Sequence, residues 1–298
     1  MTKRAPAVAL AAALSASVAL FAQAAQRSMY VSVVNEAGAP VPGLGPSDFV
    51  VREDNVAREV LRVAPAEDPM QIEILVENSQ AARNYINDLR TALPPFVEKL
   101  TAPNAAGRKN EVGLVTFGER PTILTEPTTD PAQLRKGITR IFAQTGSGSY
   151  LLDAIIEVCR GFKVREAARP VIVAITTEGP EFSSRHFDLV LNPIRDTATA
   201  FHAIVVGPLS ADIDEDAHNR AIVLDQGPRE SGGRFEHLLT SMALAPKLAQ
   251  LADELTHQYK VTYARPQSLI PPERITVTAA RPGLVARGTV VKEPQSRP

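Results

Sequence analysis

Two glutamates and two serines stand where the chain could hold a cation or move a proton. Glu77 follows the apolar run IEILV, and Ser79 comes two residues later. Glu178 follows a second apolar run, and Ser149 lies in the glycine-containing stretch TGSGSYLLDAI. Carboxylate and hydroxyl oxygens are the ligands that Mg²⁺ and Ca²⁺ prefer, and a pair of carboxylates can also act as acid and base in hydrolysis. The pattern indicates an oxygen-lined site that holds a metal, performs hydrolysis or binds a partner.

The elements that must position these residues are buried strands alternating with helices. Four runs are apolar on both faces, as buried parallel strands are: residues 72–76, 111–117, 170–176 and 202–206. Apolar residues at helical spacing lie between and after them, at residues 86–100, 151–162, 187–200 and 243–258. This alternation predicts an α/β fold with a doubly wound, mostly parallel sheet. Such sheets bind ligands at the carboxyl ends of their strands, which is where Glu77 and Glu178 lie.

The two ends of the chain have a different pattern. Residues 29–63 contain short β-branched runs separated by turn sequences, and similar runs return from Tyr259 onward. Because neither segment is large enough to form a stable sheet alone, we expect both to pair in one small β-sandwich-like module. The predicted organisation is a signal peptide, the first part of the β module, a Rossmann-like α/β domain and the strands that complete the module, at residues 1–24, 27–66, 70–257 and 258–292.

The first 24 residues have the three parts of a secretory signal peptide. Lys3 and Arg4 give the charged start, residues 7–21 the apolar run, and residues 22–24 an A-x-A cleavage site. We therefore expect export to the periplasm or out of the cell. An uncleaved anchor is the alternative, although the run is short for a bilayer span of about 20 residues. We expect no transmembrane segment in the mature chain.

The charge balance excludes one class of partner. Lysine and arginine total 32 against 33 aspartates and glutamates, a formal net charge of −1. No global field therefore draws the protein to nucleic acid or to an anionic membrane. A protein or small ligand is the expected partner.

The order of the motifs resembles the von Willebrand factor A domain, and in particular the bacterial VWFA-related proteins. In that family the first strand ends in D-x-S-x-S, a later loop gives a threonine in G-x-T-x-L-x-D-A-I, and another strand ends in T-D-G. The resemblance implies that these three segments form a metal-ion-dependent adhesion site. Here they are ENSQA, TGSGSYLLDAI and TEG. The segments GAPVPGLGPSDFVVREDNVAREV, ESGGR and HQYKVTY resemble other parts of these proteins, so the resemblance covers nearly the whole mature chain.

Only one of the five family positions is retained. Ser79 matches the first serine, whereas Glu77, Ala81, Ser149 and Glu178 replace an aspartate, a serine, a threonine and an aspartate. Mg²⁺ demands near-ideal octahedral geometry, so the missing Ala81 ligand and the longer glutamates predict a degenerate site that holds no metal. Weak binding of Mg²⁺, or of the more tolerant Ca²⁺, through the four remaining oxygen-bearing residues is the alternative.

Other motifs give no competing chemistry. The acidic run 212–216 begins like a calcium loop, but Ala217 and Val223 stand where that loop needs glycine and a carboxylate, so we interpret it as a solvated acidic loop. No zinc-protease, nucleophile-elbow or phosphate-loop motif is present. The single cysteine, Cys159, lies in a helical pattern and is interpreted as a small buried hydrophobe.

The sequence thus predicts an exported, non-enzymatic binding protein with no cofactor. Its partner-binding residues would be Glu77, Ser79, Ser149 and Glu178, and its partner is an unidentified protein or ligand. Without a cation to neutralise the glutamates, the expected partner group is an arginine or lysine. Two alternatives remain open: a metal-dependent adhesion module that uses the same four residues, and a carboxylate hydrolase, which would lack sugar-stacking aromatics because the chain has no tryptophan.

Overall fold

The computed structural model describes residues 25–208, 214–266, 270 and 272–291. The predicted signal peptide, 1–24, and the first part of the acidic run, 212–213, lie outside the described residues. Within the described part of the chain, no helix is long and apolar enough to cross a membrane.

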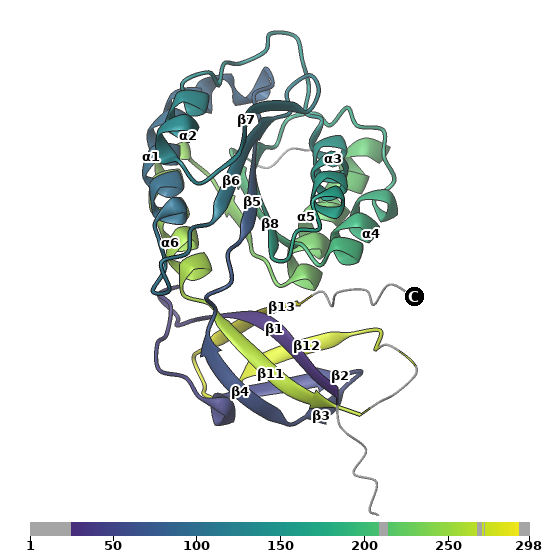
Figure 1. Ribbon diagram of the computed structural model, residues 1–298. Helices are drawn as coiled ribbons and strands as arrows, with labels where there is room; N and C mark the ends of the chain where they lie inside the picture. Colours follow the sequence, from purple (N-terminus) through teal and green to yellow (C-terminus); the bar gives the residue numbers. More distant parts are fainter. Residues whose placement is uncertain (1–24, 209–213, 267–269, 271, 292–298) are drawn as a thin grey trace, which may run out of the picture.

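A six-stranded sheet forms the centre of the larger domain (Figure 1). Its order is β10-β9-β8-β5-β6-β7, and every neighbouring pair is parallel except β6 with β7. The strands are β5 (Gln71–Val76), β6 (Glu111–Thr116), β7 (Thr122–Thr128), β8 (Pro170–Thr177), β9 (Ala200–Val206) and β10 (Phe235–Leu238). The predicted doubly wound, mostly parallel sheet is confirmed, and β5 and β8 lie side by side at its middle.

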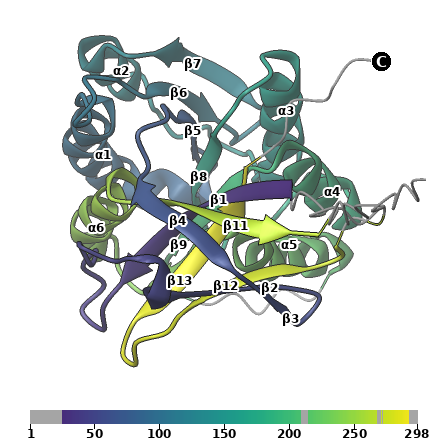
Figure 2. The ribbon, with the colours of Figure 1, turned by 60° about the horizontal axis from the view of Figure 1, so that its bottom comes forward.

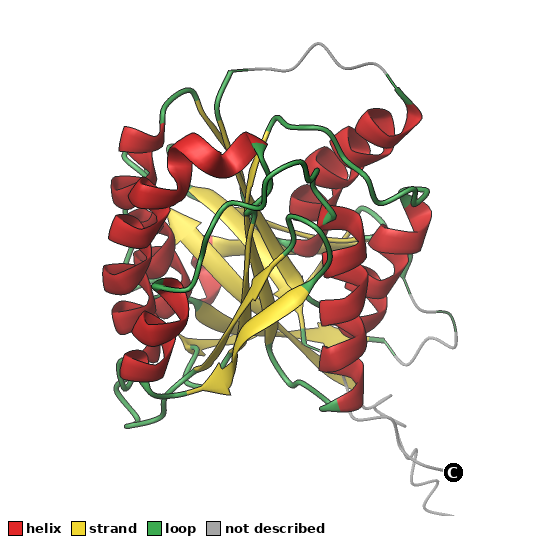
Figure 3. Ribbon diagram, turned by 90° about the horizontal axis from the view of Figure 1, so that it is seen from above, coloured by secondary structure: helices red, strands yellow, loops and turns green. Residues whose placement is uncertain are grey.

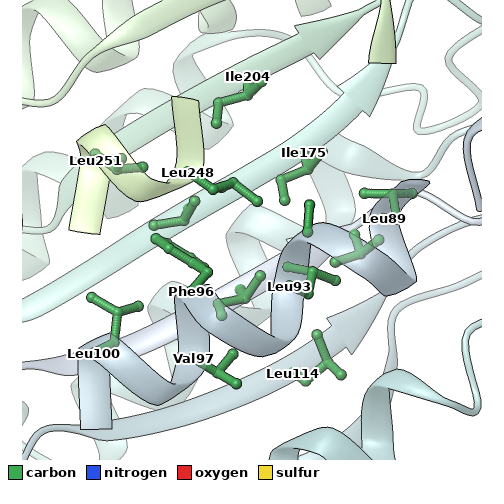
Figure 4. Close-up of a cluster of buried hydrophobic side chains, with 14 of the residues drawn as sticks. Leu89, Leu93, Phe96, Val97, Leu100, Leu114, Ile175, Ile204, Leu248 and Leu251 are labelled. Carbon is green, nitrogen blue, oxygen red and sulfur yellow. The ribbon is translucent and has the colours of Figure 1, made fainter. Parts of the chain in front are cut away.

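Helices cover both faces of this sheet (Figure 3). One layer contains α1 (Ile86–Thr101), α2 (Pro131–Ile138) and α6 (Leu244–Thr256), and the other contains α3 (Leu151–Val164), α4 (Asp188–Thr197) and α5 (Glu215–Ser231). Successive side chains of a strand point to opposite faces, so Ile74 packs in the first layer and Leu75 in the second. Figure 4 shows the first core, in which Leu93 and Phe96 of α1 and Leu248 of α6 pack together against the sheet.

Strands from both ends of the chain build the smaller module (Figure 2). One sheet has the order β13-β1-β11-β4 and the other β12-β2-β3. Their buried faces share one apolar cluster that includes Val31, Phe49 and Val261. The strands are β1 (Ala25–Val34), β2 (Phe49–Glu53), β3 (Val56–Arg58), β4 (Val60–Pro65), β11 (Tyr259–Arg265), β12 (Ile275–Ala279) and β13 (Val285–Val290). This confirms the fold predicted for the chain ends.

A buried arginine ties the module to the α/β domain. Arg169, just before β8, donates to the backbone carbonyl of Asp68 at 2.6 Å and to the side chain of Gln258. Its guanidinium also lies 4.3 Å from the centre of the Tyr30 ring in β1. Three segments that are distant in sequence therefore meet at one side chain.

A pair of glycines forms a second junction. Gly232 ends α5 with a φ of +77°, and a Cβ on it would lie 2.2 Å from the carbonyl oxygen of Gly288 in β13. Only glycine combines this backbone conformation with so close an approach. Beside them, Arg287 of β13 donates to Glu254 of α6 at 2.7 Å. The glycines of the ESGGR motif thus have a packing role.

The structure also contains elements that the sequence pattern did not predict. They are β7, β10, α2 and α5. The interpretation of residues 212–216 as a solvated loop is wrong for its described part, because Glu215 and Asp216 lie in the first turn of α5. Asp214 caps that helix, since its side chain accepts a hydrogen bond from the amide of Ala217 at 2.7 Å.

Candidate functional site

The carboxyl ends of β5 and β8 meet at the centre of one edge of the sheet. Glu77 follows β5 there, and only 1% of it is exposed. Its Oε1 accepts hydrogen bonds from the hydroxyls of Ser79 at 2.5 Å and Thr177 at 3.0 Å. Its Oε2 accepts from the hydroxyl of Thr176 at 2.7 Å and from the amide of Thr177 at 2.6 Å. Two oxygens with two donors each have no free lone pair.

The neighbouring Asn78 holds the adjacent loops in place. Its side chain donates to the carbonyl of Phe142 at 3.0 Å and accepts from the amide of Gly118 at 2.7 Å. Its carbonyl accepts from the amide of Gln144 at 2.8 Å. A Cβ on Gly118 would lie 2.5 Å from the Asn78 backbone, so this approach requires glycine. The loops after β5, β6 and α2 are therefore fixed to one another.

Ser149 is buried at the start of α3 and bonds to a residue outside the predicted site. Its hydroxyl donates to Oε2 of Glu181 at 3.0 Å, and its amide donates to the carbonyl of Pro180 at 2.9 Å. Burial raises the pKa of Glu181, opposed by its hydrogen bonds to Ser183 and by the nearby charge of Arg220. Glu181 lies only three residues after Glu178 but is not among the site residues predicted from the sequence.

Glu178 is the one predicted site residue whose side chain is partly exposed, with 22% of its surface accessible. One carboxylate oxygen lies 3.8 Å from Nη1 of Arg220, and the other lies 3.7 Å from Nε2 of His237. The expectation that no cation lies near the two glutamates is therefore wrong for Glu178. Arg220 comes from α5, which the sequence pattern did not reveal.

Arg220 is a buried residue of α5 that lies beside the end of β8, and only 6% of it is exposed. Its Nη2 donates to the carbonyl of Thr177 and to the hydroxyl of Thr176, the latter at 3.2 Å. Its Nε lies 3.8 Å from Oε2 of Glu181 and has no hydrogen-bond partner among the described residues. The guanidinium thus contacts the end of β8 and faces two carboxylates.

The structure distributes the four predicted residues over three small groups. Glu77 and Ser79 bond to each other and to the end of β8, Ser149 bonds to Glu181, and Glu178 faces Arg220. A serine hydroxyl is directed at a glutamate in the first two groups. The three groups are joined through the threonines of β8 and through Arg220.

The donor set does not fit a divalent metal ion. All four acceptor positions of Glu77 are engaged, and the methyl group of Ala81 lies against Gly179, because a Cβ on that glycine would be 2.5 Å from it. The Arg220 guanidinium already lies 3.8 Å from a carboxylate oxygen of Glu178 and 3.8 Å from one of Glu181. Within the described ranges, no group of three or more histidine, cysteine, aspartate or glutamate side chains could hold a metal.

Large apolar side chains are exposed on loops at the same edge of the sheet as this polar centre. Phe142 is 62% exposed in the loop after α2, and Phe182 is about half exposed in the loop after β8. Leu239 and Met242 follow β10 and are more exposed still. Their loops lie at the carboxyl ends of the parallel strands, so this edge of the sheet combines a closed polar centre with an apolar rim, defined here as Phe142, Phe182, Leu239 and Met242.

Residues 72–179 match the family model of the von Willebrand factor type A domain. This stretch runs from β5 to just beyond β8 and includes Glu77, Ser79, Ser149 and Glu178. The α/β domain of the chain thus has a von Willebrand factor A-like fold.

Several solved structures are similar to the chain. Proximal thread matrix protein 1 from the mussel byssus is 12% identical, with a TM-score of 0.48 over 72% of this chain and 50% of that protein, so the match spans half of its length. A von Willebrand factor type A protein from Catenulispora acidiphila is 11% identical, with a TM-score of 0.48 over 90% of this chain and 73% of that one. The corresponding domain of the pilus tip protein Mfa5 from Porphyromonas gingivalis is 10% identical, with a TM-score of 0.48 over 64% and 96%. No curated protein sequence matches.

Proposed function

We propose that this chain is an exported, non-enzymatic protein that binds a protein or ligand through the carboxyl-end face of its von Willebrand factor A domain, without a metal. The observation that carries the proposal is the apolar rim around a polar centre whose own charges and hydrogen bonds are already engaged. Aromatic residues and methionine are enriched in protein interfaces, and charged residues are depleted at their cores. The four exposed residues of the apolar rim match that enrichment, and the charged groups of the centre are mostly buried and face one another.

Two residues of the apolar rim, Phe142 and Phe182, are fixed by contacts with neighbouring side chains. The Arg90 guanidinium lies 4.3 Å from the centre of the Phe142 ring. The Phe182 ring is perpendicular to that of Tyr150, with centroids 6.2 Å apart. Side chains that are already fixed lose less conformational entropy when they bind. Both phenylalanines are therefore good anchors for a partner.

The four residues predicted from the sequence have unequal roles in this proposal. Glu77, Ser79 and Ser149 are buried, so they position the loops that carry the rim. Glu178 can touch a partner. Because Arg220 already faces Glu178, the reason for expecting an arginine or lysine on the partner is removed, and we propose contact that is mainly apolar.

The hydrolase alternative gains no support. A catalytic carboxylate needs a free oxygen within hydrogen-bond reach of the proton it transfers, and both oxygens of Glu77 already accept two hydrogen bonds. The metal-dependent alternative conflicts with the same contacts and with Arg220. Export rests on the signal-peptide pattern of residues 1–24.

Affinity capture with matched variants tests the binding face. The immobilised chain would be exposed to periplasmic and culture extracts, with and without EDTA, as wild type, as Phe142→Ser/Phe182→Ser and as Val164→Ser. Val164 is the control because it is 78% exposed at the end of α3, which lies at the amino-end edge of the sheet. We expect a partner that wild type and Val164→Ser retain in EDTA and that the double variant loses.

Two results would contradict this function. Retention that EDTA abolishes and Mg²⁺ restores would favour the metal-dependent adhesion module. Retention that is equal in the double variant and the wild type would exclude the apolar rim. Export is tested separately by sequencing the amino terminus of the protein from the periplasmic fraction, which should begin after Ala24.

A further inference from the structure

We propose that the Arg220 guanidinium is a built-in cation, which supplies from within the chain the positive charge that a metal ion would supply at a metal-dependent site of this type. The disagreement between the donor set and a metal ion is the starting point, because acceptors that would be free for a metal are engaged by Arg220 and by hydroxyl groups. The geometry around the end of β8 carries the inference in three steps.

The first step is the amount of negative charge at this edge. Glu77 and Glu181 are buried, and Glu178 is mostly buried, so three carboxylates lie at the carboxyl ends of the two central strands. Burying a carboxylate is costly unless hydrogen bonds or an opposite charge compensate it. The four donors on Glu77 compensate that group. Glu181 accepts hydrogen bonds from Ser149 and Ser183, and the opposite charge that faces both Glu178 and Glu181 is that of Arg220.

The second step is the position of the cation. Arg220 lies between these two carboxylates, with Nη1 at 3.8 Å from Glu178 and Nε at 3.8 Å from Glu181. It is anchored by donating to the carbonyl of Thr177. It also reaches Glu77 indirectly, because the hydroxyl of Thr176 accepts from Arg220 and donates to Glu77. One guanidinium therefore faces or is linked to all three carboxylates.

The third step concerns the choice between arginine and metal. A divalent ion placed among Glu77, Glu178 and Glu181 would meet the positive charge of Arg220 at short range, with little solvent to screen it. The chain's own cation thus excludes a second one. Unlike a bound ion, the side chain cannot dissociate, so the loops at this face keep one arrangement whatever the divalent cation concentration.

This inference deepens the proposed function, since it names what makes the face independent of metal. Its test needs no partner. A failure of partner capture would therefore count against the proposed function alone, and a failure of the following experiment would count against the role of Arg220 alone.

The experiment is thermal melting of the full chain in EDTA and in millimolar Ca²⁺ or Mg²⁺. The test variant is Arg220→Ser, which opens space and removes the charge. The control is Arg195→Ser, which removes an exposed arginine of α4 that pairs with Glu230 of α5. For the wild type, and likewise for the control, we expect the melting temperature in EDTA to equal that in the divalent cation. Arg220→Ser should melt lower in EDTA and gain roughly 5–10 °C when the cation is about 100 times above its Kd.

A double variant covers the case in which Arg220→Ser does not fold. Arg220→Ser/Glu181→Gln removes one of the unbalanced carboxylates, so it should fold without a cation and show a smaller cation response than Arg220→Ser. The inference is overturned if a divalent cation raises the melting temperature of the wild type, if Arg220→Ser melts like the wild type in both conditions, or if the double variant also fails to fold.

Discussion

A histidine at the junction of the two domains gives a pH dependence that can be measured. His202 lies in β9, is 1% exposed, and neither ring nitrogen has a hydrogen-bond partner among the described residues. Burial lowers the pKa of its imidazole to about 4. Glu254 opposes this shift, whereas Arg287 and Arg234 add to it, and Glu236 and Lys247 line the same small cavity.

The sign follows from comparing the folded and unfolded chains. In the unfolded chain the imidazole titrates near its ordinary pKa of 6.5, so below that pH the unfolded state binds a proton that the folded state refuses. The stability associated with neutral His202 is present above pH 6.5 and is lost as the pH falls through about 4. A pKa difference of about 2.5 units corresponds to about 3 kcal/mol of unfolding free energy.

Replacing the side chain isolates this contribution. His202→Leu keeps an apolar group of similar size in the buried position, and His218→Gln is the control because His218 is exposed on α5. Urea unfolding followed by circular dichroism between pH 7 and pH 4 should show the wild type and His218→Gln losing about 3 kcal/mol more than His202→Leu. Titration of all other groups is common to the proteins and cancels in the comparison. Equal pH dependence of His202→Leu and the wild type would refute the reasoning.

Three further predictions concern other parts of the chain. Burial raises the pKa of Glu73 to about 7 despite its ion pair with Arg165, so stability is lost as pH rises from about 4.5 through 7, and Glu73→Gln should be up to about 3 kcal/mol more stable than the wild type in urea at pH 8 but not at pH 4.5. The triple variant Glu77→Asp, Ala81→Ser, Glu178→Asp restores the family's side chains, and calorimetry should detect a Mg²⁺ site only when Arg220→Ser is added to it. Tight Mg²⁺ binding by the triple variant alone would contradict this expectation. Deleting every residue after Gln258 removes β11, β12 and β13, and hydrogen exchange should then show that β1 and β2 have lost protection, whereas native protection in these strands would contradict the shared module.

The strength of the hydrophobic pattern determined which elements could be predicted. The four central strands are continuous apolar runs because helices cover both their faces, and Glu77 and Glu178 were found by their position after such runs. In contrast, β7 is a half-exposed edge strand with a proline, and α5 is a mostly polar helix whose buried apolar side chains include Val223 and Leu224. Neither has a clear period, so neither was expected.

Because α5 was not predicted from the sequence, the positive charge that Arg220 brings to the site was not predicted either. Arg220 lies 43 residues beyond Thr177 in the chain, and only the folding of α5 brings it to the end of β8. No short motif predicts such a contact. Glu181 is close to Glu178 in the sequence, three residues after it. Its role could still not be predicted, because it depends on the backbone bridge to Ser149, which is a tertiary contact.

The β module built from both chain ends sets an order for folding. Met29 of β1 pairs with Val261 of β11, so the first strand waits for a partner that is synthesised more than 200 residues later. Closing so long a loop of unfolded chain is entropically costly. The α/β domain shortens it, because once its sheet has formed, the amide of Ala66 lies 2.8 Å from the carbonyl of Gln258. We therefore expect the domain to act as the template on which the module closes. A defect in the sheet's core should then delay the pairing of β1 with β11, even though neither strand contains the altered residue.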